Sequence, residues 1–504
     1  MLDIFLALLP IMGALSILLL SKIPAVAKSP VKKLIDVVDN YFGMTAFAML
    51  SGTFVGLMIF LKSSGLSAEN FQIIGSTCFH TITDNFSVLV GVYLLFIIVY
   101  VLKNSSVITP LNSFISTFCN TPGKLVLLLI TLGVIFSIDD YLAVIAISLI
   151  LAESATSIGF SKEKFSFMVN LTAVACCCLS PFSSWAPVIK SILSASGADG
   201  VVAYTAIPFN FTAMILIAVV IFTGIFKPCA FSSTPINMKH EKVKRSKTMI
   251  PSEIPVLFAV LALLISSLLL MTFVTDTEYP LIKSCGISLF FTVVVFLRKG
   301  YITAPKLGES FIDASVSSLK LSVLLLSIWL LANVCTNLLG LAEYIGLYAT
   351  QYDFPLKIVP VVLFILGSVF AFTTGSAFST FGLLLPVGVQ LGGTSGSPML
   401  QTVAIAAVLS GALMASFSFS SDCLPLIAEH TQCNINNLQM NQMFYASVVF
   451  LSGMVAFTVA PYMVNYGMLA SYIPIMVSIG LLGFLFTIPY LSTLTQTKKH
   501  VKTS

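Results

Sequence analysis

Two adjacent carboxylates, Asp139 and Asp140, lie in the middle of an otherwise apolar segment, residues 124–152. A charged side chain at the centre of a bilayer costs roughly 2.5–3.5 kcal/mol on insertion scales, and such residues usually serve a function. Two neighbouring carboxylates also repel each other, so that one of them is expected to hold a proton near neutral pH. The pair is therefore a candidate site for a cation or a proton within a membrane.

Three further polar interruptions of apolar segments offer hydroxyl and carbonyl oxygens, which a hard cation such as sodium prefers. Serines and prolines at 179–187 and 416–425 are expected to break two helices from within. A third polar cluster, residues 373–379, interrupts the apolar segment 357–391. The candidate ion ligands are Asp139, Asp140, Ser180, Ser183, Ser184, Thr374, Ser376, Ser421 and Asp422, with the three aspartates supplying the charge for sodium.

Each of these candidates also has a purely structural interpretation. The aspartates could cap the helix that follows, and Asp140 alone could do so while Asp139 binds the ion. The serines between 180 and 184 could satisfy the backbone of a broken helix. Thr374 and Ser376 could simply be small residues that let two helices approach closely.

The composition is that of a membrane protein. Apolar residues make up 57% of the 504 residues, and charged residues make up only 9%, whereas soluble proteins carry about 25%. The net charge of +5 is small and lies in loops, which gives no indication of nucleic-acid binding. We therefore predict an all-α polytopic membrane protein. About eleven segments are long enough to span a bilayer, near 2–21, 43–62, 84–102, 166–190, 203–226, 254–274, 279–298, 319–340, 399–428, 443–463 and 470–492.

The distribution of Lys and Arg predicts the orientation of these spans. The basic linker 227–252 and the basic C-terminus are expected inside a bacterial inner membrane, and the N-terminus outside. Loop 63–83 has no basic residue, which places it outside with Asp84 at its edge. Lys190 falls at the end of a predicted span, where its side chain is expected to reach the interface.

These orientations agree only if segment 124–152 enters and leaves the membrane on the same side. The segment is therefore predicted to be a re-entrant hairpin with the aspartate pair at its tip, and segment 357–391 a second hairpin from the opposite side. Non-helical backbone is tolerated at this depth only where protein or water satisfies it.

The two halves of the chain show the same order of segments at an offset of 236 residues. Because the charge rule gives equivalent segments opposite directions, this pattern predicts an inverted-topology repeat, with a site near the midplane where broken helices meet. The predicted units are a first repeat at 1–226 with hairpin 124–152 and broken helix 166–190, the cytoplasmic linker 227–252, a second repeat at 253–463 with hairpin 357–391 and broken helix 399–428, and an extra helix with a tail at 464–504.

Three stretches of the first half resemble motifs of the NhaC-type sodium/proton antiporter family. They are Phe136-Ser137-Ile138-Asp139-Asp140-Tyr141, Ser161-Lys162-Glu163-Lys164-Phe165 and Ser180-Pro181-Phe182-Ser183-Ser184-Trp185. The likeness extends over residues 80–450 through Thr373-Thr374-Gly375-Ser376 and Asp422-Cys423-Leu424-Pro425. The resemblance implies an inverted-repeat transporter with two hairpins. Members of that family also include exchangers of sodium with malate and lactate.

The combined expectation is a secondary transporter that exchanges sodium for protons across the membrane by alternating access. A coupled carrier of a small organic acid or an amino acid is the alternative, although no cationic residue is expected centrally. An intramembrane aspartyl protease fits less well, since its carboxylates come from separate elements, and a passive channel fits poorly with broken helices at a closed site. No nucleotide-binding motif and no zinc spacing occur. We expect no cofactor, with sodium, protons and lipid as the partners and a homodimer as a possible assembly.

Overall fold

The computed structural model describes residues 44–107, 118–225, 280–341, 355–393, 396–419, 421, 423–463 and 472–480, together with isolated positions elsewhere. All regular secondary structure in this part is helical. Seven of its helices are long and apolar enough to cross a membrane, or eight if one bent pair counts as a single span. The chain is an all-α membrane protein. The count of eleven spans stays a prediction, because the segments near 2–21, 254–274 and 470–492 lie mostly outside the described residues.

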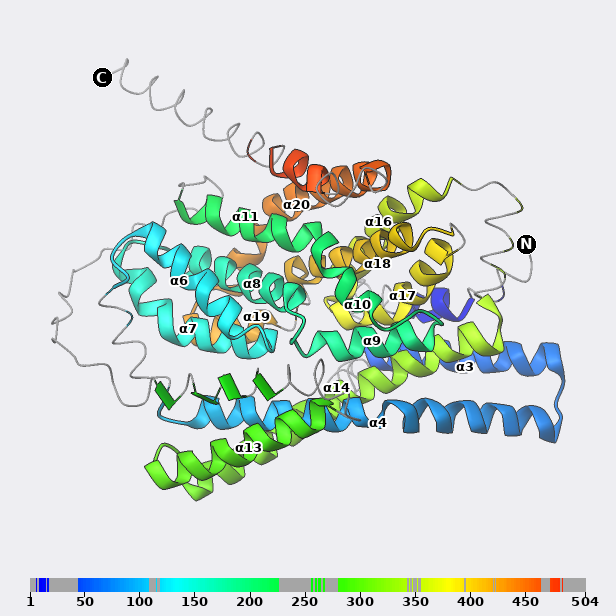
Figure 1. Ribbon diagram of the computed structural model, residues 1–504, viewed down its shortest axis with the longest axis horizontal. Helices are drawn as coiled ribbons and strands as arrows, with labels where there is room; N and C mark the ends of the chain where they lie inside the picture. Colours follow the sequence, from blue (N-terminus) through cyan, green and yellow to red (C-terminus); the bar gives the residue numbers. More distant parts are fainter. Residues whose placement is uncertain are drawn as a thin grey trace, which may run out of the picture.

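Four long helices form one layer of the molecule (Figure 1). They are α3 (Met44–Ser64), α4 (Ala68–Asn104), α13 (Pro280–Lys299) and α14 (Ala304–Asn333). Helix α14 packs against both α3 and α4, and α13 packs against α4. The 37 residues of α4 make it about 55 Å long at 1.5 Å per residue, which exceeds the roughly 30 Å hydrocarbon core of a bilayer.

Helices α4 and α14 run antiparallel. Asn104 near the end of α4 donates a hydrogen bond to Ser310 near the start of α14 (2.9 Å), and Tyr93 pairs with Ser315 (3.2 Å). Residue numbers therefore increase in opposite directions along the two helices, as their ribbons in Figure 1 show.

The second layer contains two helix–turn–helix pairs. In the first, α6 (Pro122–Ile135) and α7 (Asp140–Ser157) pack against each other, and in the second α16 (Val359–Thr374) packs against α17 (Ala377–Gly393). The turns fall at residues 136–139 and 375–376, where the sequence predicted the two hairpin tips. Whether each pair enters and leaves the bilayer on one side stays a prediction.

Two helices of this layer are broken at the predicted serine-rich positions. Residues 180–184 separate α8 (Lys162–Leu179) from α9 (Trp185–Ala195). In the second half, α18 (Pro398–Ala412) continues into the 3-10 helix η6 (Leu413–Phe417), and α19 (Cys423–Thr431) begins after the break. These breaks place non-helical backbone inside the layer.

The sequence predicted one straight span at 203–226, but the structure contains a further break there. The short helix α10 (Val202–Thr205) and the 3-10 helix η2 (Ile207–Phe209) end at Asn210, and α11 (Phe211–Ile225) leaves at a bend of 41°. The second half has one continuous helix instead, α20 (Ile435–Met463). The remaining short elements are the π-helix η4 (Val334–Leu338) and the 3-10 helix η5 (Leu356–Ile358).

The element boundaries recur along the chain. Helices α3, α4 and α8 begin 236 residues before α13, α14 and α18, and the other equivalent helices keep this offset to within three residues. The equivalent helices α4 and α14 are antiparallel, which is the relation expected within an inverted repeat. The predicted domain boundaries and the sides of the membrane stay predictions.

Three predicted span starts were wrong, including that of α20, which begins at Ile435 rather than at residue 443. Helix α4 begins at Ala68 rather than at residue 84, and α14 begins at Ala304 rather than at residue 319. The predicted outside loop 63–83 is therefore mostly helical, and Asp84 lies in the middle of α4. Hydropathy marked only the apolar half of each helix, whereas the polar half is helical too.

Candidate functional site

Asp139 is the N-cap of α7 and is almost fully buried, with 4% of its surface exposed. Its Oδ1 accepts a hydrogen bond from the backbone N–H of Leu142 (3.0 Å), and its Oδ2 accepts one from the hydroxyl of Ser184 (3.1 Å). The backbone N–H of Ser184 also donates to the carbonyl of Ile138 (2.7 Å). The tip of the α6–α7 pair is thus joined directly to the break between α8 and α9.

Asp140, the first residue of α7, is 7% exposed and has fewer partners. Its Oδ2 accepts a long hydrogen bond from the Cys423 thiol (3.7 Å), and its Oδ1 has no hydrogen-bond donor among the described residues. The indole of Trp185 lies near this carboxylate without reaching hydrogen-bond geometry. Because an unpaired buried carboxylate oxygen is costly, Asp140 is the carboxylate that a proton or a cation would stabilise most.

The roles of the two aspartates differ from the alternative drawn from the sequence. That alternative had Asp140 capping the helix and Asp139 free to bind the ion. In the structure Asp139 caps α7, because its extended backbone precedes the first helical turn and turns the carboxylate toward the free N–H groups. Asp140 is then left with the open oxygen.

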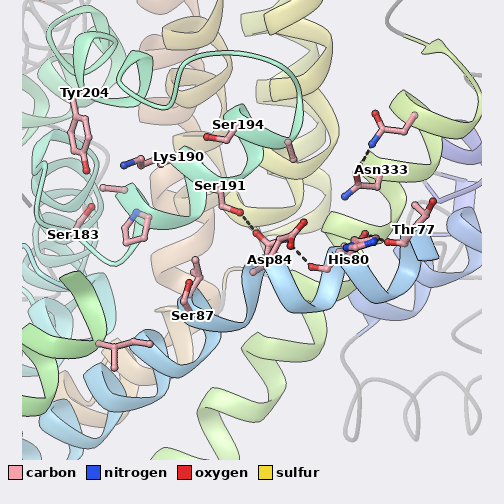
Figure 2. A pocket seen from close by; sticks show the side chains of 18 of the residues that line it. Thr77, His80, Asp84, Ser87, Ser183, Lys190, Ser191, Ser194, Tyr204 and Asn333 are labelled. Atoms are coloured by element: carbon pink, nitrogen blue, oxygen red, sulfur yellow. Dashed lines mark hydrogen bonds between the residues drawn. The ribbon is translucent and has the colours of Figure 1, made fainter. Parts of the chain in front are cut away.

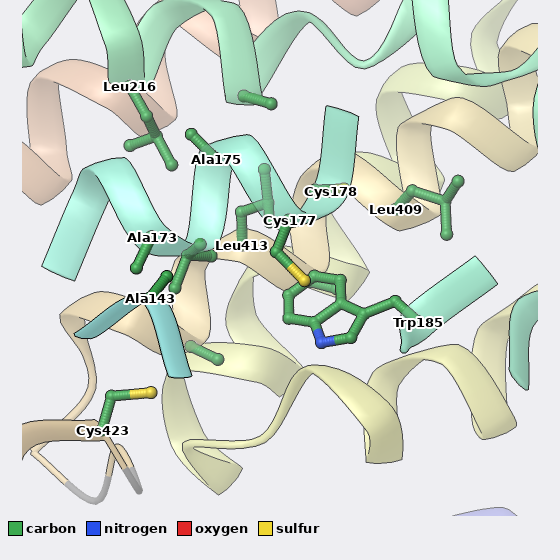
Figure 3. Close-up of a cluster of buried hydrophobic side chains, with 14 of the residues drawn as sticks. Ala143, Ala173, Ala175, Cys177, Cys178, Trp185, Leu216, Leu409, Leu413 and Cys423 are labelled. Carbon is green, nitrogen blue, oxygen red and sulfur yellow. The ribbon is translucent and has the colours of Figure 1, made fainter. Parts of the chain in front are cut away.

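Both halves of the chain contribute to the surroundings of the carboxylate pair. Cys423 comes from the start of α19, behind the second break. The ring of Trp185 packs edge-on against Phe378 (5.9 Å between centroids) and Phe381 (5.5 Å) of α17. Figure 3 shows Trp185 beside Cys177, with Cys423 on another element of the same core. The pair therefore lies where the two halves meet.

The hydroxyls at the second tip are engaged in their own turn. Thr374 Oγ1 accepts hydrogen bonds from the Ser379 hydroxyl (3.2 Å) and from the backbone N–H of Ser376 (3.3 Å). Gly375 has a φ of +75°, a left-handed conformation that favours glycine. No hydrogen bond within the described structure joins Thr374 or Ser376 to the aspartates, so their role as ion ligands stays a prediction.

The remaining predicted ligands have mixed positions. Ser183 is buried, whereas Ser180 is half-buried and its Oγ accepts from the N–H of Phe182 (3.4 Å). Ser421 is buried in the second break. Asp422 lies outside the described residues, and the described part contains no group of three or more His, Cys, Asp or Glu side chains that could hold a metal ion. The three-aspartate sodium site is therefore untested.

Sequence reasoning missed the amides that satisfy the broken backbone. Helices α8 and α20 direct three side-chain amides at carbonyl groups freed by the second break, which lowers the cost of burying that backbone. The donors and acceptors are Asn170 to Ser416 (2.8 Å), Gln442 to Phe417 (2.9 Å) and Gln439 to Phe419 (3.0 Å). Of the three, only Asn170 falls inside a predicted span, at 166–190, and it was the available signal.

Asn210 serves the third break in the same way. Its Nδ2 donates to the sulfur of Cys178 in α8 (2.6 Å), and its Oδ1 accepts from the hydroxyl of Ser410 in α18 (2.7 Å). The same oxygen accepts from the backbone N–H of Ala213 at the start of α11 (3.4 Å). One fully buried amide thus links helices of both halves.

A cavity of about 750 Å³ lies between α4 of the first layer and α9 of the second (Figure 2). Asp84 and His80 line it from α4, and Lys190 lines it from α9. Ser183 of the first break also contributes to its wall. Sequence reasoning missed this cavity, because Asp84 had been placed at the edge of a loop and Lys190 at the end of a span.

No family model matches the chain. One similar protein is an uncharacterized protein of Haemophilus influenzae, which is 23% identical over 387 residues. The similarity covers 69% of this chain and 72% of that protein. These comparisons name no function, and it is the many apolar helices that agree with a membrane transporter in general terms.

Proposed function

We propose that this protein is a secondary active transporter that exchanges sodium ions for protons across a bacterial inner membrane. The observation that carries the proposal is the buried pair Asp139 and Asp140, placed at the meeting of a helix-pair tip with a broken helix. Asp140 keeps one carboxylate oxygen without a donor among the described residues. A buried anionic pair with an open oxygen suits a cargo that is a cation or a proton.

Competition between the two cargoes would produce the exchange. Asp140 would bind sodium or a proton, but not both. Asp139 would add negative charge while its position is fixed by the cap and by Ser184. Sodium prefers oxygen ligands, and the serine hydroxyls of the first break, which reach the pair through Ser184, would supply them. Protonation on one side of the membrane would release sodium, and sodium binding on the other side would release the proton. The two movements would thereby be coupled.

Alternating access would follow from the arrangement of equivalent helices. Antiparallel α4 and α14 belong to the two halves of the chain, and each half also carries one helix-pair tip and one broken helix. Such repeats can present a midplane site to either side in turn. The chain has no nucleotide-binding motif of the G-x-x-x-x-G-K-[ST] type, which favours an ion gradient as the energy source.

Proton flux in proteoliposomes tests the proposal. Vesicles containing the protein are loaded with a pH-sensitive dye, and sodium, lithium, potassium and choline chloride are added in turn, with empty vesicles as the control. We expect sodium to drive proton movement that choline does not. Equal traces for sodium and choline would contradict sodium/proton exchange.

A second candidate function is a cation-coupled carrier of a small organic acid or an amino acid. The observation that favours it is the cavity between α4 and α9, in which Lys190 supplies the cationic group that the sequence did not predict at a central position. Uptake of labelled malate, lactate and amino acids by the same vesicles separates this function from simple ion exchange.

A further inference from the structure

We propose that the cavity between α4 and α9 binds a zwitterionic α-amino acid, with the carboxylate of the ligand at Lys190 and its ammonium group at Asp84. The inference deepens the proposed transport function, on which it rests, by naming a class of cargo beside the cation. It assigns the cavity to a solute and leaves the Asp139–Asp140 pair to the coupling ion.

The size of the cavity fits an organic solute. Its volume of about 750 Å³ lies within the range of roughly 300–1,000 Å³ that is typical of small-molecule sites. A bare sodium ion needs only a few oxygen atoms around it. The Asp139–Asp140 pair, which is not among the residues lining the cavity, already offers these.

The charges on the walls fit a ligand that carries both signs. Lys190 extends from α9 and Asp84 from α4, on different walls of the cavity (Figure 2). Neither side chain forms an ion pair within the part of the chain that the structure describes. Both side chains are exposed, and both line the cavity. Two unneutralised groups of opposite sign leave both a cationic and an anionic partner to be supplied by the ligand.

Other ligand classes fit this pair of charges less well. A dicarboxylate such as malate would place its second negative group in the field of Asp84, and like charges in close proximity are unfavourable. A monocarboxylate such as lactate would leave Asp84 without a partner. An α-amino acid carries a partner for each of the two groups in one molecule.

Polar neighbours complete the site. His80 lies one helical turn before Asp84 on the same face of α4. The hydroxyl of Ser191, next to Lys190, donates a hydrogen bond to the side-chain oxygen of Asn85, next to Asp84. This hydrogen bond holds the lysine-bearing helix against the aspartate-bearing one.

The serines of the first break connect the cavity with the carboxylate pair. Ser183 lines the cavity, and the next residue, Ser184, donates to Asp139. A solute that shifts the break would therefore act on the groups that hold the coupling ion. This adjacency provides a physical route for coupling solute to cation.

Thermal stability and uptake test the assignment. Purified protein in sodium buffer is screened with each of the twenty common amino acids, and uptake of any stabilising amino acid is measured in proteoliposomes. The corresponding amine, which lacks the carboxylate, and the corresponding 2-hydroxy acid, which lacks the ammonium group, serve as matched probes. We expect at least one amino acid to stabilise the protein and to be taken up, whereas its two analogues do neither.

Two variants test the residues. Lys190→Gln and Asp84→Asn should each lower amino-acid affinity by about tenfold or more, the scale of one lost charge-assisted contact, while sodium-induced proton flux without amino acid persists. Lys190→Arg, which keeps the charge, should retain part of the affinity. The matched controls are Lys299→Gln and Asp313→Asn, which are exposed and lie outside the cavity.

The outcomes separate the two proposals. Sodium/proton exchange without binding of any amino acid would overturn the amino-acid site and leave the exchange function standing. Equal uptake of the 2-hydroxy acid, or unchanged affinity in Lys190→Gln and Asp84→Asn, would also overturn the site. Amino-acid uptake that needs neither a sodium nor a proton gradient would support the site and contradict the coupled transport.

Discussion

The hydroxyl of Ser184 donates a hydrogen bond to Oδ2 of Asp139 across a distance of 3.1 Å. This contact joins the tip between α6 and α7 to the break between α8 and α9, and the cap to Leu142 occupies the other oxygen of the same carboxylate. Asp139 is therefore held in place, whereas the neighbouring Asp140 has an oxygen without a donor within the described structure. The two aspartates are adjacent in sequence but have different environments.

The cap on α7 predicts different effects of two substitutions at residue 139. Asp139→Ala should lower the stability by about 0.5–2 kcal/mol, since alanine cannot accept the N–H of Leu142. Asp139→Asn should remain close to the wild type, because asparagine is also a good N-cap. Thermal unfolding in detergent measures both, and equal melting temperatures for the two variants would contradict the capping role.

The open oxygen of Asp140 predicts that this residue is the more sensitive one in transport. Asp140→Asn should reduce sodium-induced proton flux to the level of empty vesicles, because the variant can neither bind nor release a proton there. Asp139→Asn should keep a measurable flux with weaker sodium affinity, since it removes only charge. The control is Asp313→Asn, a substitution at an exposed residue. A larger loss in Asp139→Asn than in Asp140→Asn would reverse the assignment.

Competition for one site predicts the effect of pH. As the pH falls, protons occupy the carboxylate pair more fully and exclude sodium, so the sodium concentration needed for half-maximal flux should rise. In the limit of simple competition that concentration rises about tenfold for each unit of pH below the point where the site titrates. Flux titrations at several pH values measure it. A half-maximal concentration independent of pH would rule out a shared site.

The amide of Gln442 predicts a stability effect far from the carboxylates. Gln442→Leu leaves the carbonyl of Phe417 without its donor in a buried break, and we expect a loss of about 1–3 kcal/mol. The preceding residue of α20, Asn441, is only half-buried, so Asn441→Leu provides a neighbouring control. Thermal unfolding in detergent compares the two variants. Equal unfolding temperatures would show that the break does not depend on the amide of Gln442.

Much of the architecture could be predicted from the pattern of apolar and polar residues. The two helix–turn–helix tips, the two serine-rich breaks and the offset of 236 residues between helix starts lie where the sequence indicated, whereas the re-entrant hairpins and the inverted repeat stay predictions. Prolines and serines inside apolar segments give a local signal, since they interrupt helical hydrogen bonding wherever they occur. The first halves of α4 and α14 gave no such signal, because their many polar residues give a low hydropathy, which is also typical of loops.

The candidate site was only partly predictable for a similar reason. Asp139 and Ser184 were both expected at one site, but their hydrogen bond was not predicted. Which aspartate caps α7 depends on backbone geometry. The cavity depends on α4 being helical through Asp84, so that His80 and Asp84 fall on one face toward Lys190. Pairings between distant helices such as Asn210 with Ser410 have no local signal at all.

The most direct test of the account is sodium-induced proton movement in proteoliposomes containing the double variant Asp139→Asn, Asp140→Asn. Asparagine keeps the size of both side chains and the cap on α7, so we expect a folded protein with the wild-type oligomeric profile in detergent. The account predicts that this variant shows no sodium-dependent flux above empty vesicles, while Asp313→Asn behaves as the wild type. Wild-type exchange by the double variant would contradict the central claim that these two carboxylates bind the transported ions.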